Sequence, residues 1–158
     1  MTFGIIDRNS HKYYTYMKDV FSAINGAQRD YNWLITDCEC YPQNSEIEQL
    51  LEQEYCWLSG DELTDIIEKE NFQWIWGILC GFERDVTLEE VLKYPLPCVQ
   101  KYSGYYSNPV RLQHPLSTVE IVPCDSSHTL IISKDKNITD SYLKCCPKAE
   151  DLFLYNQK

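Results

Sequence analysis

The alternation of apolar and polar residues along the chain predicts a strand, a helix and a second strand in its first quarter. Residues 2–6 are mostly apolar and indicate a short strand. Apolar side chains in 11–25 then recur at helical intervals, and Asn25-Gly26 is typical of a helix C-terminus. Strict alternation in 31–41 predicts a strand. Because its inward positions become acidic at 37–39, we expect a bulge or a strand end there.

Three short helices are predicted by capping boxes, in which a Ser or Thr is followed three residues later by Glu. The boxes are Ser45–Glu48, Ser59–Glu62 and Thr87–Glu90. The first two helices also carry apolar residues at i, i+3 and i+4, which give each an inner face. Between them, Tyr55–Leu58 forms either a short strand or a packed connection.

The second half of the chain predicts a covered strand, a long loop and a hairpin. Residues 72–82 are almost continuously apolar, as in a strand buried on both faces. Residues 95–117 are rich in Pro, Gly, Ser and Asn and indicate a loop. Residues 118–122 and 128–133 then predict two strands of a hairpin, and the apolar end of the tail, 152–155, should dock on the body.

This order of elements predicts an α+β fold, with a single mixed, mainly antiparallel sheet and helices packed on it. The length of 158 residues fits one globular domain spanning 1–158. Hydrophobic residues make up 44% of the chain and aromatic residues 13%, which excludes a disordered chain.

The start of the chain lacks the basic and apolar segments of a signal peptide, and no apolar run is long enough to span a membrane. We therefore expect a cytoplasmic protein that does not bind membranes. The eight cysteines are then reduced thiols. A secreted, disulfide-bonded domain is the alternative.

Acidic residues are concentrated in one window of the chain. The net charge is −10, and residues 46–70 hold nine acidic side chains against a single lysine, a net of −8. The rest of the chain is close to neutral. The acidic side chains of the window are Glu46, Glu48, Glu52, Glu54, Asp61, Glu62, Asp65, Glu68 and Glu70.

Two interpretations of this window remain open. Acids in the first turn of a helix complement its dipole, but those near the helix C-termini, such as Glu52, Glu54 and Glu68, are disfavoured there. Like charges at helical spacing also repel. A cluster that persists despite this repulsion suggests attraction of a cationic partner. An ordinary solvated face explains it equally well.

Cysteine and histidine offer weaker candidates for chemistry. The pairs Cys38-x-Cys40 and Cys145-Cys146 lack the spacing of zinc knuckles, so we expect no metal and no cofactor. Cys124 and His128 could form a nucleophile and base, but neighbours in a tight loop rarely reach the required geometry. No hydrolase, nucleotide-binding or metalloprotease motif occurs, and no basic stripe would bind nucleic acid.

Three short segments resemble a small family of bacterial proteins of unknown function. They are Tyr31-Asn32-Trp33-x-Ile35, Trp57-x-Ser59-Gly60-x-x-Leu63, and Val119-Glu120-Ile121 with Asp125-Ser126 and Ile131-x-Ser133-Lys134-Asp135. This resemblance implies no activity and transfers no catalytic residues. In size, acidity and aromatic content the chain is also similar to immunity proteins, which neutralise secreted bacterial toxins, often basic nucleases. That second similarity is one of type and not of motif.

The leading hypothesis is a non-enzymatic binding protein of immunity type, a monomer or weak dimer, whose acidic helices cover a basic toxin. Tyr55 and Trp57 would be its anchors if exposed. One alternative is a small enzyme or ligand-binding protein with a cleft near Cys124, His128 and the Tyr102–Tyr106 loop, with a thiol of low pKa. Another is an interaction subunit without a toxin. The predicted partner-binding residues are Glu48, Glu52, Glu54, Tyr55, Trp57, Asp61, Asp65 and Glu68.

Overall fold

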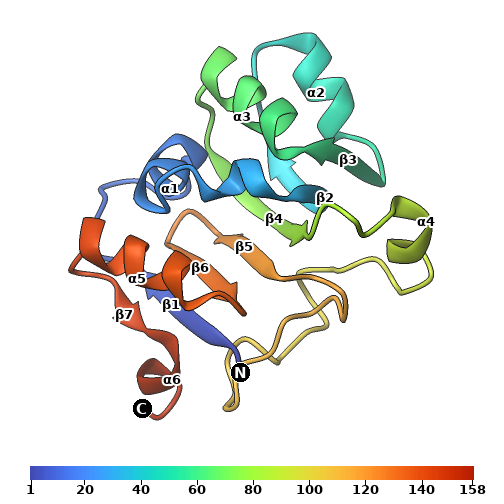
Figure 1. The fold of residues 1–158 in the computed structure, drawn as a ribbon. Helices are drawn as coiled ribbons and strands as arrows, with labels where there is room; N and C mark the ends of the chain where they lie inside the picture. Colours follow the sequence, from blue (N-terminus) through green and yellow to red (C-terminus); the bar gives the residue numbers. More distant parts are fainter.

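Seven strands form one sheet at the centre of the computed structural model, which describes residues 1–158 (Figure 1). The strand order is β3-β2-β4-β5-β6-β1-β7, and every neighbouring pair is antiparallel. The α+β prediction is confirmed, and the sheet contains no parallel pair. The strands are β1 (Phe3–Asp7), β2 (Asn32–Cys40), β3 (Tyr55–Ser59), β4 (Trp74–Phe82), β5 (Val119–Cys124), β6 (His128–Ser133) and β7 (Glu150–Asp151).

Strand β4 lies between β2 and β5, and its two sets of side chains enter different cores, as its continuous apolar sequence predicts. Trp74 and Leu79 belong to the larger core, whereas Ile78 and Phe82 belong to the smaller one. The sheet is therefore buried on both faces at its centre.

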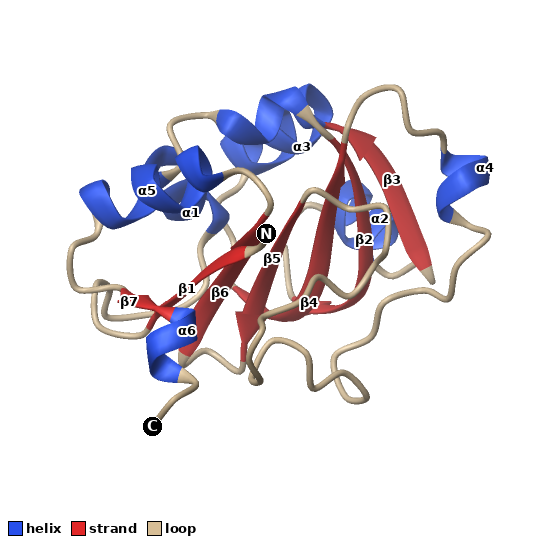
Figure 2. Ribbon diagram, turned by 60° about the horizontal axis from the view of Figure 1, so that its bottom comes forward, coloured by secondary structure: helices blue, strands red, loops and turns tan.

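Four helices cover the face of the larger core, and Figure 2 shows α1, α3 and α5 along that face. Met17, Leu63 and Tyr142 are their most deeply buried contributions. None of the helices is long and apolar enough to span a membrane. The helices are α1 (Met17–Ala23), α2 (Ser45–Leu51), α3 (Gly60–Lys69), α4 (Leu88–Val91), α5 (Lys136–Cys145) and α6 (Leu152–Tyr155), with a 3-10 turn η1 (Ala27–Asp30).

The loop predicted at 95–117 covers the other face of the sheet, together with α4 and α6. One buried carboxylate on β5, Glu120, holds this loop. Its Oε1 accepts hydrogen bonds from the Tyr105 hydroxyl at 2.6 Å and the Gln113 amide at 2.7 Å. Its Oε2 accepts from the His114 amide at 2.9 Å and the Ser117 hydroxyl at 2.6 Å.

Two local predictions are wrong. The helix expected over 11–25 begins only at Met17, because Tyr16 forms a β-bridge with Gln73 that takes the preceding chain away from a helix. The first capping box is also wrong, since the side chain of Asn44, not Ser45, accepts hydrogen bonds from the first turn of α2. The boxes at the starts of α3 and α4 are both present.

The bulge expected near 37–39 is confirmed. The register between β2 and β4 shifts between Thr36 and Glu39, and Asp37 has a left-handed φ of 52°. Part of the tail docks as predicted, since Leu152 is buried, while Phe153 and Leu154 remain 50% and 60% exposed.

Candidate functional site

The acidic window of the sequence forms one side of the molecule, around α2 and α3, which lie next to each other in Figure 1. We call the carboxylates of residues 46–70 the acidic edge. The Glu70 carboxylate, at the end of α3, accepts hydrogen bonds from the backbone amides of Gln43 and Asn44 at 2.8 and 2.9 Å. These bonds hold the end of α3 against the start of α2, which brings the charges of both helices together.

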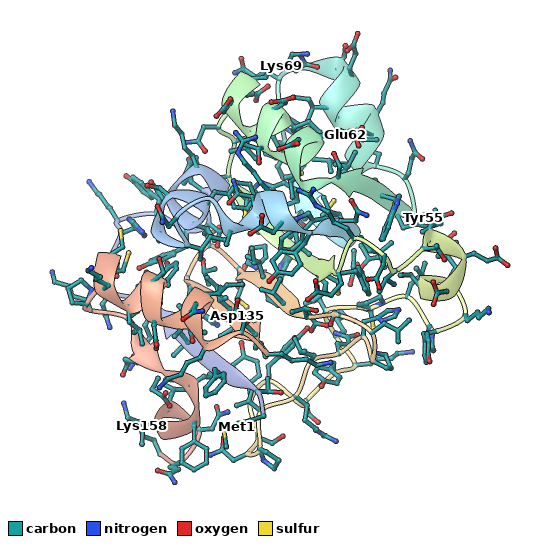
Figure 3. The ribbon with its side chains drawn as sticks, in the orientation of Figure 1. Met1, Tyr55, Glu62, Lys69, Asp135 and Lys158 are labelled. Carbon is teal, nitrogen blue, oxygen red and sulfur yellow. The ribbon has the colours of Figure 1, made fainter.

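Three further acids of the acidic edge have partners within the molecule. Glu62, labelled on α3 in Figure 3, completes the capping box of this helix by accepting a hydrogen bond from the Ser59 amide at 2.9 Å. Asp61 and Glu68 lie 2.9 and 3.8 Å from the Arg29 guanidinium. All these groups are exposed, so each ion pair contributes little stability. Together with Glu70, four of the nine acids are thus explained by local structure.

The other five acids have no partner within the molecule, although Glu46 and Glu48 lie in the first turn of α2, where the helix dipole favours them. All are exposed, and none lies within ion-pairing distance of a basic side chain or accepts a side-chain hydrogen bond. Glu52 stands at the C-cap of α2, where the helix dipole disfavours negative charge. The five are Glu46, Glu48, Glu52, Glu54 and Asp65.

Tyr55 and Trp57 lie on β3, the edge strand beside β2, and both are half-buried. Their rings point to the face of the sheet opposite α2 and α3, because the Trp57 ring packs 5.7 Å from that of Phe82 in the smaller core. Both residues nevertheless line a hollow of about 340 Å³ that also includes Glu54. Tyr55 and Trp57, the predicted anchors, are therefore next to the acidic edge at Glu54. Their rings lie on the opposite face of the sheet from the acidic helices α2 and α3.

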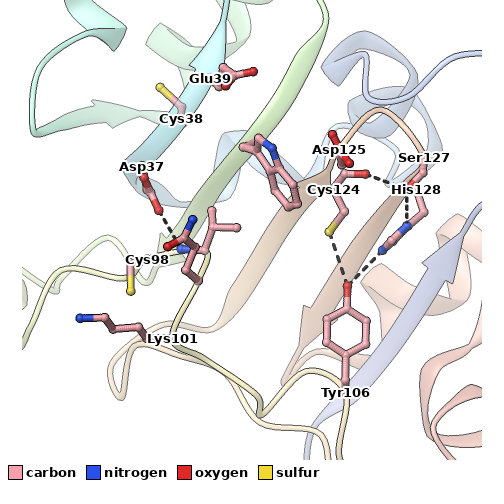
Figure 4. Close-up of a pocket in the computed structure, with 13 residues that line it drawn as sticks. Asp37, Cys38, Glu39, Cys98, Lys101, Tyr106, Cys124, Asp125, Ser127 and His128 are labelled. Carbon is pink, nitrogen blue, oxygen red and sulfur yellow. Dashed lines mark hydrogen bonds between the residues drawn. The ribbon is translucent and has the colours of Figure 1, made fainter.

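A larger cleft of about 1140 Å³ opens beside the hairpin of β5 and β6, and Figure 4 shows its lining. We call it the hairpin cleft. It combines the bulge of β2, the start of β4, the loop after α4 and the hairpin. Its polar and reactive side chains include Asp37, Trp76, Cys98, Lys101, Tyr106, Cys124, Ser127 and His128.

A chain of hydrogen bonds lies on the hairpin side of this cleft, opposite Asp37 and Lys101 (Figure 4). The Ser127 hydroxyl lies 2.8 Å from Nδ1 of His128, and Nε2 of His128 lies 3.0 Å from the Tyr106 hydroxyl. The same hydroxyl lies 3.6 Å from Sγ of Cys124 (Figure 4). The sequence hypothesis placed a cleft near Cys124, His128 and the Tyr102–Tyr106 loop. The structure has a cleft at this hairpin, lined by Cys124 and His128 and, from that loop, by Tyr106.

The protonation states of these groups do not favour nucleophilic catalysis. Burial raises the pKa of the Cys124 thiol to about 11, so it lacks the low pKa that the enzyme hypothesis requires. Burial also lowers the pKa of His128, with a smaller effect from Arg8, and raises that of Tyr106. The Cys124, His128 and Tyr106 side chains are therefore uncharged near pH 7, and they can donate hydrogen bonds to a bound ligand or accept them from it.

Sequence reasoning missed Asp37, Trp76 and Lys101 as cleft residues. They come from three separate segments, which meet because the bulge at Asp37 places β2 beside the loop after α4. The Asp37 carboxylate accepts a hydrogen bond from the Val99 amide at 2.8 Å. In the sequence, the loss of alternation at 37–39 was the available signal for this region, but it predicted only a bulge in the strand and not a cleft.

The fold and these two surfaces define an antiparallel α+β protein with an acidic helical edge and a polar cleft. A family model described as "Protein of unknown function (DUF2691)" matches residues 2–96, and the chain belongs to this family. The matched region includes the segments 31–35 and 57–63 that resemble a family of unknown function, and it ends before β5. No curated protein and no solved structure matches the chain.

Proposed function

We propose that the protein is a cytoplasmic binding protein of immunity type, which covers a basic surface of a bacterial toxin with its acidic edge. The observation that supports this proposal is the set of five exposed carboxylates without a partner in the molecule. Because no contact within the chain neutralises these charges, a cationic surface can approach them without breaking an internal ion pair.

Charge of one sign on one side of a molecule acts mainly on association. It raises the encounter rate with an oppositely charged partner, and this effect weakens as salt screens the charges. Repulsion between neighbouring carboxylates at helical spacing costs the free protein about 0.2–0.5 kcal/mol per pair. A basic partner would relieve this repulsion, which adds to the attraction.

The hollow beside β3 supplies an apolar contact next to these charges. Half-buried Tyr and Trp side chains bury large areas at protein interfaces and often dominate binding energy. Since Glu54 lines the same hollow as Tyr55 and Trp57, we propose that a basic side chain of the partner meets Glu54 while apolar atoms cover the two rings.

The test compares two variants with the same net charge. One neutralises acids of the acidic edge (Glu52→Gln, Glu54→Gln, Asp65→Asn, Glu68→Gln). The matched control neutralises exposed acids elsewhere (Asp30→Asn, Asp85→Asn, Glu89→Gln, Asp140→Asn). Each protein serves as bait in a low-salt pull-down from the native host, followed by a salt step.

We expect the wild type and the control variant to retain the same basic protein in stoichiometric amount, and the edge variant to lose it. The association rate measured with that purified partner should fall as the salt concentration rises for the wild type and the control variant only. Equal retention by the edge variant would show that the acidic edge is not the binding surface.

The immunity role itself needs a growth assay. Expression of the captured partner without this protein should stop growth of the host, and coexpression of the wild type should restore it. A partner that is harmless when expressed alone would reduce the proposal to an interaction subunit without a toxin, which keeps the surface but not the role.

The hairpin cleft supports a second candidate function, the binding of a small polar ligand. Its volume of about 1140 Å³ is slightly above the usual range of small-molecule sites, and a tyrosine, a histidine and a lysine supply polar contacts on its walls. Tyr106→Phe removes the central hydroxyl with little change in volume. A ligand of this cleft should raise the melting temperature of the wild type more than that of Tyr106→Phe, and equal shifts would place the ligand elsewhere.

A further inference from the structure

A third cluster of polar side chains lies where β1 ends next to the C-terminus of α5. Asp7 is the last residue of β1 and is completely buried, His11 follows in the next turn, and Cys146 caps the end of α5. A carboxylate oxygen, an imidazole nitrogen and the thiol sulfur of these residues all lie within 4.8 Å of one another. None of the three belongs to the acidic edge or lines the hairpin cleft.

Two buried polar atoms in this cluster have no hydrogen-bond partner. They are Nε2 of His11 and the hydroxyl oxygen of Ser10. Buried polar atoms without a hydrogen bond are costly and rare in native proteins, so two of them at adjacent residues point to a site that can accept a ligand. The other ring nitrogen of His11 lies 4.0 Å from the Asp19 carboxylate, which leaves Nε2 as the free nitrogen.

The Asp7 carboxylate is held in place by donors on both oxygens. Oδ1 accepts from the Tyr14 hydroxyl and the Ser10 amide, each at 3.1 Å, and Oδ2 accepts from the Tyr142 hydroxyl at 2.6 Å. A carboxylate oxygen has two lone pairs, so Oδ2 can accept one further bond. Ligands in metal sites are fixed by surrounding hydrogen bonds of this kind, including a carboxylate near the second nitrogen of a histidine.

We propose that Asp7, His11 and Cys146 bind a zinc ion. Thiolate, imidazole and carboxylate together are the ligand types of Zn²⁺, whereas Ca²⁺ and Mg²⁺ take oxygen ligands. Zinc bonds of roughly 2.0–2.3 Å require ligand atoms somewhat closer than 4.8 Å, and the partly exposed His11 side chain can make this shift. The Ser10 hydroxyl or a water would take the fourth position.

The site has a structural consequence. It would join the end of β1 to the end of α5, two segments that are more than 130 residues apart in the chain. A metal that binds only the folded state stabilises that state by mass action. We therefore expect Zn²⁺ to raise the melting temperature of the chelator-treated, reduced protein.

The test is a titration of chelator-treated, reduced full-length protein with Zn²⁺ in competition with a chromophoric chelator, and with Co²⁺ as a spectroscopic probe. The wild type should bind one ion per chain and, with Co²⁺, show thiolate-to-metal charge-transfer absorption. His11→Gln and Cys146→Ser should each weaken binding at least about tenfold, the usual minimum effect of a change around a metal site. Cys146→Ser should also remove the charge-transfer absorption.

His128→Gln and Cys40→Ser are matched controls, since they change the same residue types outside the cluster. Both should keep the affinity and the absorption of the wild type, and circular dichroism should show every variant folded. Absence of binding by the wild type would overturn the site. So would a Cys146→Ser variant that keeps the absorption, or controls that weaken binding as much as the site variants.

Discussion

At the scale of single residues, Glu120 shows how a buried charge organises a loop that has no secondary structure of its own. Four donors from the loop surround its two oxygens, as described above, and two of these donors are backbone amides. In Glu120→Gln, an NH₂ group would replace one of the acceptor oxygens and would face hydrogen-bond donors. We expect a loss of roughly 2–4 kcal/mol in the free energy of unfolding, measured by urea denaturation.

The control for this prediction is Glu89→Gln, an exposed acid on α4 that makes no such contacts. It should change stability by less than about 0.5 kcal/mol. If the two variants were equally stable, the buried carboxylate would have no part in fixing the loop.

The pKa of His128 leads to a second prediction at this scale. Burial lowers this pKa below the ordinary 6.5, so the unfolded chain takes up a proton at higher pH than the folded protein does. The contribution of His128 to stability is therefore complete above pH 6.5 and is lost as the pH falls through the folded pKa. Urea unfolding at several pH values should show a smaller loss of stability on acidification for His128→Gln than for the wild type. Equal slopes would contradict the prediction.

At the scale of elements, the segment Trp57-x-Ser59-Gly60-x-x-Leu63 determines how α3 begins and where it packs. Ser59 caps the helix, and Leu63 is completely buried. Gly60 lies against η1, because a Cβ built at this position would be 2.2 Å from the carbonyl oxygen of Gln28 and 2.6 Å from Cα of Arg29. Those neighbours are backbone atoms, which cannot move aside without shifting η1.

We therefore expect Gly60→Ala to destabilise the protein by about 1–3 kcal/mol, the usual cost of overpacking, although alanine is the better helix former. Gly26→Ala is a useful comparison, since a Cβ there meets no atom within 4 Å and the cost comes only from its positive φ. Thermal unfolding of both variants measures the difference. A Gly60→Ala protein as stable as the wild type would mean that α3 can move away from η1.

At the scale of the whole molecule, the sheet joins the two ends of the chain. Strand β1 pairs only with β6 and β7, both of which lie beyond residue 96, and β4 pairs with β5. A fragment of residues 1–96, the region that the family model matches, would leave β1 without either neighbour. We expect this fragment to be unfolded by circular dichroism, and the full chain to unfold in a single cooperative transition.

The exposure of the acidic side chains on α2 and α3 also affects how they contribute to stability. Neutralising these acids removes repulsion and breaks only the exposed pair of Glu68 with Arg29, which contributes little. The edge variant proposed above should therefore be at least as stable as the wild type. Loss of partner binding at unchanged or raised melting temperature would assign the charges to function. A marked fall in melting temperature would instead assign them to the fold.

The sequence by itself determined the kinds of elements, the α+β class and the position of the negative charge. These features follow from local patterns: alternation in β2, capping residues before α3 and α4, and a run of apolar residues in β4. Local reasoning failed at the start of α1, since the bridge between Tyr16 and Gln73 joins residues far apart in the chain.

Only the tertiary structure decided which side chains meet. It placed Tyr55 and Trp57 on the opposite face of the sheet from the acidic helices, and it added Asp37 and Lys101 to the hairpin cleft. It also brought Cys146 to Asp7 and His11. Spacing along the chain reports on contacts within a helix or strand, whereas these groupings depend on strand order and register, which arise from burial of the whole sheet.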